Sequence, residues 1–169
     1  MQNMFDFNGF KSGFVTLVGR PNAGKSTLLN AIMGKKIAIT SNTAQTTRHR
    51  FRAVKTTEDY QLVIVDTPGI HKPHDALGEE LNTSAIKALE DVDVVAMLID
   101  SSMPVGTGDE WVANQLKRIK TPKVLVLSKT DLVDDAAVEA QRKAALELCE
   151  WDCVVTRRPG ARLDRTGGL

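Results

Sequence analysis

GRPNAGKS, residues 19–26, is the stretch that decides the fold of this 169-residue chain. It matches the pattern G-x-x-x-x-G-K-[ST], in which the backbone N–H groups of a glycine-rich loop surround phosphate oxygens. Lys25 can reach the β- and γ-phosphates, and the hydroxyl of Ser26 can coordinate Mg²⁺. A chance glycine turn is the alternative, but the pattern follows a β-rich run and opens a helical one, which favours a phosphate loop. We therefore assign nine consecutive residues to nucleotide binding: Gly19, Arg20, Pro21, Asn22, Ala23, Gly24, Lys25, Ser26 and Thr27.

Strand-like and helix-like runs alternate on both sides of this loop. The apolar patterns predict strands at 14–18, 51–57, 61–65, 92–99, 124–127 and 151–155, and helices at 26–33, 78–90, 111–119 and 134–150. The second and third strands are separated only by a short polar turn, which predicts an antiparallel hairpin. The alternation elsewhere predicts an α/β three-layer sandwich, with a mostly parallel sheet, one antiparallel strand and helices on both faces.

The composition is that of one ordinary globular domain, with 42% apolar and 25% charged residues. The formal net charge of +1 gives no argument for a nucleic-acid-binding domain. No apolar run approaches the roughly 20 residues that a membrane-spanning helix needs. Two cysteines, Cys149 and Cys153, have no partner cluster for a zinc site or a disulfide framework, so we expect them to be small buried side chains in a reducing environment.

A second candidate stretch is Asp66-Thr67-Pro68-Gly69, directly after the predicted strand 61–65. A carboxylate at the carboxyl end of a strand beside a phosphate loop is placed to hold Mg²⁺, usually through water. The N–H group of Gly69 can then meet the γ-phosphate. A Pro-Gly turn with a helix-capping aspartate would be the preferred interpretation if the phosphate loop were absent.

A third stretch, Ser128-Lys129-Thr130-Asp131, ends the predicted strand 124–127. The carboxylate of Asp131 can accept hydrogen bonds from N1–H and the exocyclic amine of guanine, and adenine lacks this donor pair. The stem of Lys129 can lie along the base. A surface turn that opens a helix is the alternative, but the position at a strand's carboxyl end favours base binding and GTP over ATP.

The fourth stretch, QTTRHR at 45–50, lies in the long irregular segment before the hairpin. The hydroxyl of Thr47 can complete the Mg²⁺ shell when a γ-phosphate is present, so this loop can order on triphosphate and relax after hydrolysis. Its basic residues can equally be a solvated surface.

In their order and spacing, GRPNAGKSTLLN, QTTRHR and DTPGIHKP resemble the Era family, GTPases of the translation-factor-related class. The resemblance covers about 13–155. It implies a Ras-like P-loop GTPase domain with a six-stranded mixed sheet, which hydrolyses GTP to GDP. It further implies a monomer that acts on the small ribosomal subunit and its rRNA, in the cytoplasm and peripherally at the inner face of the cell membrane. Carried over, the resemblance assigns the Mg²⁺ site to Ser26, Thr47 and Asp66.

Ile70, which we group with the nucleotide-binding residues, stands where Ras-like GTPases keep a water-orienting glutamine. An aliphatic side chain cannot orient water. In relatives of this class a K⁺ ion near the phosphates serves instead, held partly by an asparagine that matches Asn22. We therefore expect slow turnover, with catalytic roles for Asn22, Lys25, Thr47 and Gly69.

Three departures from the family pattern stand out. Ser128 replaces the usual asparagine, which buttresses the phosphate loop and contacts guanine N7, so weaker binding with retained specificity is expected. Arg157-Arg158-Pro159 follows the last strand in place of a Ser-Ala pair that supports guanine O6. The sequence contains no counterpart of the family's C-terminal RNA-binding domain of the KH type, which we expect to be absent.

The polar N-terminus predicts a disordered lead (1–13), which is followed by a GTPase domain (14–156). The departures predict an aberrant, unstructured tail (157–169). The Arg/Gly/Pro/Ala composition of the tail suggests a frameshifted or truncated product. Two rival functions remain open at this point. One is an ATP-dependent phosphotransferase, because kinases share the phosphate loop, and the other is a GTP-binding fragment with little turnover.

Overall fold

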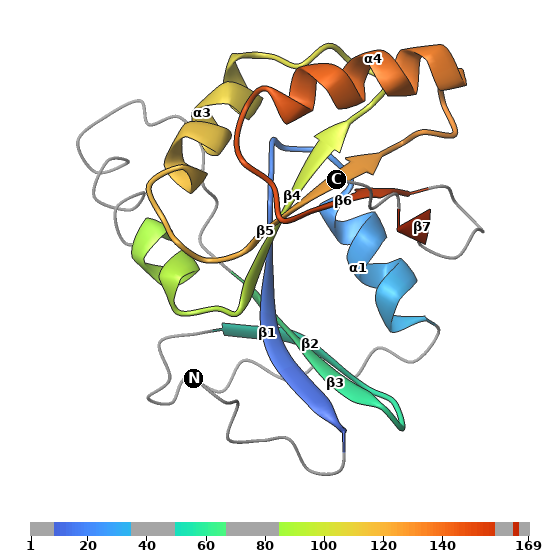
Figure 1. The fold of residues 1–169 in the computed structure, drawn as a ribbon. Helices are drawn as coiled ribbons and strands as arrows, with labels where there is room; N and C mark the ends of the chain where they lie inside the picture. Colours follow the sequence, from blue (N-terminus) through green and yellow to red (C-terminus); the bar gives the residue numbers. More distant parts are fainter. Residues whose placement is uncertain (1–8, 35–49, 67–84, 158–163, 166–169) are drawn as a thin grey trace.

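The computed structural model describes residues 9–34, 50–66, 85–157 and 164–165 (Figure 1). Its centre is a seven-stranded sheet. The strands are β1 (Lys11–Val18), β2 (Arg50–Thr56), β3 (Tyr60–Asp66), β4 (Val94–Asp100), β5 (Lys123–Ser128), β6 (Cys153–Thr156) and β7 (Asp164–Arg165). The helices are α1 (Lys25–Met33), α3 (Thr107–Leu116) and α4 (Asp135–Leu146), and residues 85–90 are also helical.

The order of the strands in the sheet is β2-β3-β1-β4-β5-β6-β7. β3, β1, β4, β5 and β6 are mutually parallel, whereas β2 and β7 each pair antiparallel with their neighbour. The chain leaves β1 and returns first on one side of it, at β3, and later on the other side, at β4. β1 is therefore a topological switch point, the place where open α/β sheets bind ligands beyond the carboxyl ends of their strands.

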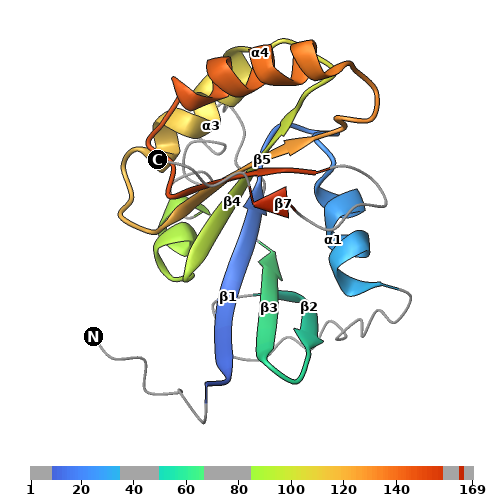
Figure 2. The same ribbon diagram turned by 45° about the vertical axis from the view of Figure 1, so that its right-hand side comes forward.

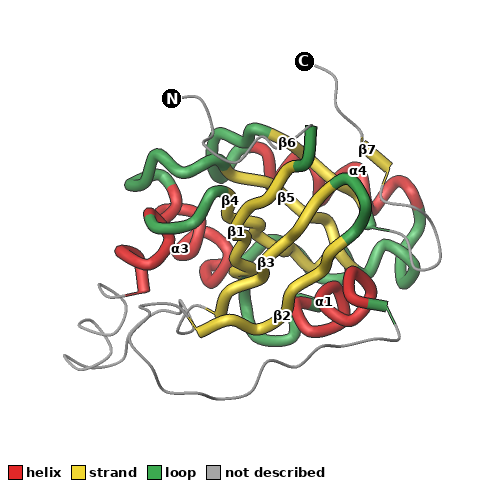
Figure 3. The backbone as a smooth tube through the Cα atoms, turned by 90° about the horizontal axis from the view of Figure 1, so that it is seen from below, coloured by secondary structure: helices red, strands yellow, loops and turns green. Residues whose placement is uncertain are grey.

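Helices cover both faces of the sheet, as the alternating sequence predicted (Figures 1 and 3). The larger core joins alternate strand side chains such as Val95, Met97 and Leu125 to Leu89, Val112 and Leu116 of the helical segments. On the other face, Leu28 of α1 packs on Ala96, Leu98 and Val126. The central strands are buried on both faces, which explains why β4 and β5 read as continuous apolar runs.

Local sequence features account for the helix boundaries that bear on the site. α4 begins where the carboxylate of Asp134 accepts a hydrogen bond from the N–H of Ala137 at 2.7 Å, so Asp134 is the N-cap of this helix. α3 begins at Thr107, four residues before the apolar pattern that starts at Trp111. Its first turn is closed by Asp109, which accepts a hydrogen bond from the N–H of Gly106 at 3.0 Å.

The predicted fold class is confirmed, and three differences concern the boundaries and the tail. β1 begins at Lys11, so the prediction of a disordered lead is wrong for its last residues, which pair with β3. β7 is a second antiparallel strand and a seventh strand in a sheet expected to have six. The prediction of an unstructured tail is therefore wrong for Asp164–Arg165, which pair with Val155 and Thr156 along the edge of β6 (Figure 2).

The expected helix at 78–90 is confirmed for residues 85–90, and its first part lies outside the described residues. Of the helices that the structure describes, none combines the length and apolar character needed to cross a membrane.

Candidate functional site

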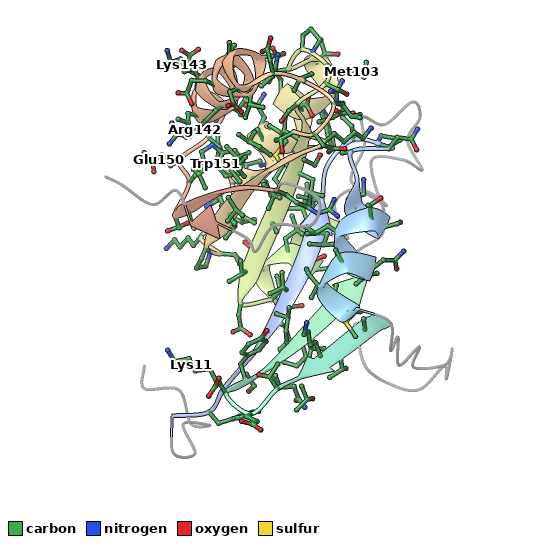
Figure 4. All side chains as sticks on the ribbon, turned by 90° about the vertical axis from the view of Figure 1, so that its right-hand side faces the viewer. Lys11, Met103, Arg142, Lys143, Glu150 and Trp151 are labelled. Atoms are coloured by element: carbon green, nitrogen blue, oxygen red, sulfur yellow. The ribbon has the colours of Figure 1, made fainter. Side chains whose placement is uncertain are left out.

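The carboxyl ends of five parallel strands meet at one edge of the sheet, and the predicted motifs lie there. The phosphate loop follows β1, Asp66 is the last residue of β3, and Ser128 is the last residue of β5. β4 ends beside β5, because Asp100 is in register with Ser128. Figure 4 shows this polarity: Lys11, at the start of β1, and Met103, just after β4, lie at opposite ends of the molecule.

The phosphate loop contains three residues with positive φ, at Gly19 (139°), Asn22 (63°) and Gly24 (95°). At Gly19 only glycine fits, because an added Cβ would lie 2.5 Å from the carbonyl oxygen of Leu98 on β4. The loop can therefore turn tightly against the sheet at this position.

Lys25 begins α1 and turns its side chain back across the loop. Its Nζ donates to the carbonyl oxygens of Gly19 and Arg20, both at 2.7 Å. Ser26 and Thr27 follow in the exposed first turn of α1. This helix has no side-chain cap and no acidic residue in its first turn, so its unsatisfied N–H groups and its dipole favour an anion there.

Ser128 joins the third motif to the phosphate loop. Its side chain is fully buried, and its Oγ lies 2.6 Å from the carbonyl oxygen of Ala23 and 3.1 Å from that of Ile99. The single hydroxyl proton is best placed for the shorter of these contacts. Serine is shorter than the asparagine of the family pattern, yet it reaches the loop, so this chain retains a buttress between the two motifs.

Lys129 adopts a positive φ of 54°, and its Nζ forms an ion pair with Oδ2 of Asp100 at 2.6 Å. Burial alone would raise the pKa of Asp100, but hydrogen bonds from Lys129 and Ser102 and the charge of Lys129 outweigh it, so this pKa is lowered. Asp100 therefore remains ionised and holds the ammonium group of Lys129 in place.

The last two residues of the motif face different surroundings. The hydroxyl of Thr130 is part-buried and donates to the carbonyl oxygen of Arg157 at 2.6 Å, which ties the motif to the end of β6. The side chain of Asp131 is exposed, as a carboxylate that is to meet a ligand must be.

Several predicted site residues lie outside the described residues: Thr47, Thr67, Pro68, Gly69 and Ile70. Asp66 is described only as the backbone end of β3, in register with Arg50. The structure thus brings together the phosphate loop and the 128–131 motif, and it places Asp66 on the neighbouring strand. Within the described ranges, no three His, Cys, Asp or Glu side chains form a group that could hold a metal ion.

Sequence reasoning missed two carboxylates that support the site, Asp100 and Asp109. Asp100 could have been found by the rule applied to Asp66, because it is a carboxylate at the carboxyl end of a buried strand. Asp109 forms an ion pair with Arg20 of the phosphate loop, in which Nε of Arg20 lies 3.0 Å from Oδ2 of Asp109. Its sequence surroundings, Gly-Thr-Gly-Asp, contain two glycines that disfavour a helix, and the N-cap is Gly106 rather than the threonine.

Comparison with known proteins identifies the family to which the chain is similar. Residues 14–129 match the family model described as 50S ribosome-binding GTPase. The chain is 50% identical over 146 residues to a GTPase Era of Clostridium botulinum, covering 86% of this chain and 49% of that protein. It is 46% identical over 157 residues to GTPase Era of Nostoc, covering 91% and 48%. The chain therefore spans about half the length of the curated relatives it matches.

Solved structures of Era superpose on the same region. Aquifex aeolicus Era bound to GDP and AlF4⁻ gives a TM-score of 0.66 at 34% identity, over 86% of this chain and 50% of that one. An Era structure in complex with MgGDPNP and a segment of 16S ribosomal RNA gives 0.64 at 33% identity, over 87% and 51%. Together with the bridged motifs at the sheet edge, these matches show that the chain belongs to the Era family of P-loop GTPases, over its GTPase-domain region.

Proposed function

We propose that this chain binds GTP and GDP and slowly hydrolyses GTP to GDP and phosphate. The observation that carries the proposal is the contact between Ser128 and Ala23, because it fastens a guanine-type motif to a phosphate loop at one sheet edge. A nucleotide whose base lies beside Asp131 can then place its phosphates at the start of α1. Lys25 would turn from its carbonyl partners to the β- and γ-phosphates.

Mg²⁺ fits the donor set that the proposal brings together. Ser26 offers an exposed hydroxyl in the first turn of α1, Asp66 ends the strand next to β1, and Thr47 is proposed to complete the shell. Hydroxyl and carboxylate oxygens are the donors that Mg²⁺ prefers. Held by these residues, Mg²⁺ would neutralise the charge that develops on the phosphate oxygens during hydrolysis.

Turnover is proposed to be slow because Ile70 cannot orient the attacking water. Gly69 would meet the γ-phosphate through its N–H group. Asn22, exposed and held at positive φ within the loop, is proposed to hold a K⁺ ion near the phosphates. The charge of that ion would supply the stabilisation that Ile70 cannot.

Nucleotide competition and phosphate release test the main proposal. GTP and GDP are expected to displace a fluorescent GDP analogue in the presence of Mg²⁺, and ATP is expected not to. Equal competition by ATP would favour a phosphotransferase. Tight GTP binding with phosphate release no faster than in the absence of protein would indicate a GTP-binding fragment with little turnover.

Exchange of the monovalent cation tests the role of Asn22. We expect faster phosphate release in K⁺ than in Na⁺, and we expect Asn22→Ala to remove this difference while GDP still binds. Equal rates in the two salts, with Asn22→Ala harmless, would refute the role.

We further infer a role in assembling the small ribosomal subunit, in the cytoplasm or peripherally at the inner face of the cell membrane, as a monomer. The support is family membership, and one Era relative was solved with 16S ribosomal RNA. The resemblance assigns RNA contact to a KH domain, so isolated RNA is not a suitable probe for this chain. The whole subunit is used instead. Co-sedimentation that is stronger with a non-hydrolysable GTP analogue than with GDP is expected, and no dependence on the nucleotide would contradict a switch.

A further inference from the structure

The side chain of Arg20 extends from the phosphate loop toward the start of α3. Its Nε lies 3.0 Å from Oδ2 of Asp109, and 24% of the Arg20 side chain is exposed, against none of the Asp109 side chain. A basic residue in a phosphate loop would ordinarily be expected to contact the ligand. Here its charge is committed to a buried carboxylate on another element.

Asp109 is fixed by its own backbone surroundings. Its Oδ2 also accepts a hydrogen bond from the N–H of Gly106 at 3.0 Å, and its N–H donates to the Gly106 carbonyl at 2.9 Å. Burial raises the pKa of Asp109, and it outweighs the hydrogen bond from Gly106 and the charge of Arg20, which lower this pKa. The carboxylate is therefore a rigid feature of the first turn of α3.

The backbone of α3 is shaped to receive the arginine. A Cβ added at Gly108 would lie 2.9 Å from Cδ of Arg20, and one added at Gly106 would lie 3.4 Å from its Nη1. Both glycines therefore leave room for the arginine stem and guanidinium.

The ion pair is not an optimal source of stability. Oδ1 of Asp109 and Nη2 of Arg20 are both buried and lack a hydrogen-bond partner among the described residues. Desolvating two charges costs free energy that an incompletely bonded pair does not fully recover. A pair of this kind is better explained by the position that it enforces than by the stability that it adds.

The backbone of Arg20 is the anchor of the loop. Its carbonyl oxygen accepts from Lys25 Nζ at 2.7 Å and from the N–H of Ala23 at 3.2 Å. Ala23 is in turn held by Ser128. The loop is therefore fixed from two sides, by β5 through Ser128 and by α3 through Asp109.

We propose that Asp109 is a positioning residue for the phosphate loop, acting through Arg20 to set the geometry with which the loop receives the β-phosphate. The proposal rests on the guanine-nucleotide binding proposed above. It assigns to the start of α3 a role in nucleotide affinity in addition to its role in the core.

The test compares GDP with GMP, because GMP lacks the β-phosphate that the loop surrounds. Asp109→Asn keeps the size of the side chain and removes the charge opposite Arg20. We expect it to weaken GDP binding about tenfold, the size of one lost charge-assisted hydrogen bond, and to leave GMP binding almost unchanged. Arg20→Ala is expected to do the same, and the double variant is expected to lose no more than the worse single variant. Glu110→Gln, at the next and exposed position of α3, is the matched control.

A purely structural role would lower the melting temperature and leave the GDP-to-GMP affinity ratio of the folded protein unchanged. That result, or losses that simply add in the double variant, would overturn the proposal. If Asp109→Asn fails to fold, Arg20→Lys carries the test, since it keeps the charge at a partly exposed position and loses the Nε contact. A ratio within twofold of the unaltered chain would again overturn the proposal. Failure of the unaltered chain to bind GDP would instead refute the proposed function, and this inference with it.

Discussion

The hydroxyl of Ser128 is the contact whose removal tests the site most directly. It is completely buried and lies 2.6 Å from the carbonyl oxygen of Ala23 in the phosphate loop. Ser128→Ala deletes the hydroxyl and nothing else. The Ala23 carbonyl then loses this hydrogen bond, and no group of the substituted side chain can replace it.

The expected cost follows from that geometry. A buried polar group left without its partner costs about 1–3 kcal/mol. For a chain of this size, each 1 kcal/mol lowers the melting temperature by about 2–4 °C. The loop also becomes less ordered before the nucleotide arrives, so part of the cost appears as weaker binding. If about 1.4 kcal/mol appears there, the Kd for GDP rises about tenfold.

Two measurements separate the effect on the fold from the effect on the site. Thermal melts without nucleotide report stability, and titration with a fluorescent GDP analogue at a temperature where the protein is folded reports affinity. Thr121→Val is the matched control, because the Thr121 hydroxyl is also buried and donates to a carbonyl, that of Leu89, at 2.9 Å. This control is expected to lower the melting temperature by a similar amount and to leave the Kd for GDP unchanged.

The reasoning would be wrong if Ser128→Ala melted at a lower temperature but bound GDP as tightly as the unaltered chain. Ser128 would then support only the packing of β5. An unchanged melting temperature would contradict the assignment of the hydrogen bond itself.

Two further predictions concern neighbouring carboxylates. Asp131→Asn should weaken GTP binding by at least about a hundredfold, since two charge-assisted hydrogen bonds to guanine are lost at about 1.5–3 kcal/mol each, and ATP binding should not change. Competition titrations check this, and a retained preference for GTP would contradict it. Because the pKa of Asp100 is lowered from its ordinary value of 3.8, its ionised form stabilises the fold at pH values above 3.8. This stability is lost as the pH falls through the lowered pKa. Asp100→Asn should therefore lower the melting temperature near neutral pH and have a much smaller effect in strong acid. Equal losses at both pH values would show that its pairing with Lys129 is not the cause.

The fold class could be predicted because its determinants are local. The phosphate loop, the buried strands and the start of α4 each depend on neighbouring residues, and each appears in the structure close to where the pattern indicated. The boundary of α3 could not be read in this way. Its first turn is polar and is closed by Asp109, so the apolar period begins only at Trp111.

The tail shows a different limit. Residues 157–169 have no periodicity, and their composition indicated no regular structure. Asp164–Arg165 nevertheless pair with β6, because an exposed strand edge offers unpaired N–H and C=O groups that can bind a segment of almost any sequence. Such pairing depends on which backbone lies nearby, and composition does not contain that information.

By itself, the sequence determined that this chain has a phosphate loop, a guanine-type motif and a sheet that places their ends together. Those conclusions rest on contiguous residues and on the rule that parallel strands end at one edge. Only the tertiary structure decided how the motifs support one another. Ser128 reaches Ala23 across 105 positions, and Asp109 pairs with Arg20 from a separate helix. Contacts between residues so far apart depend on strand order and helix packing, which no local pattern specifies.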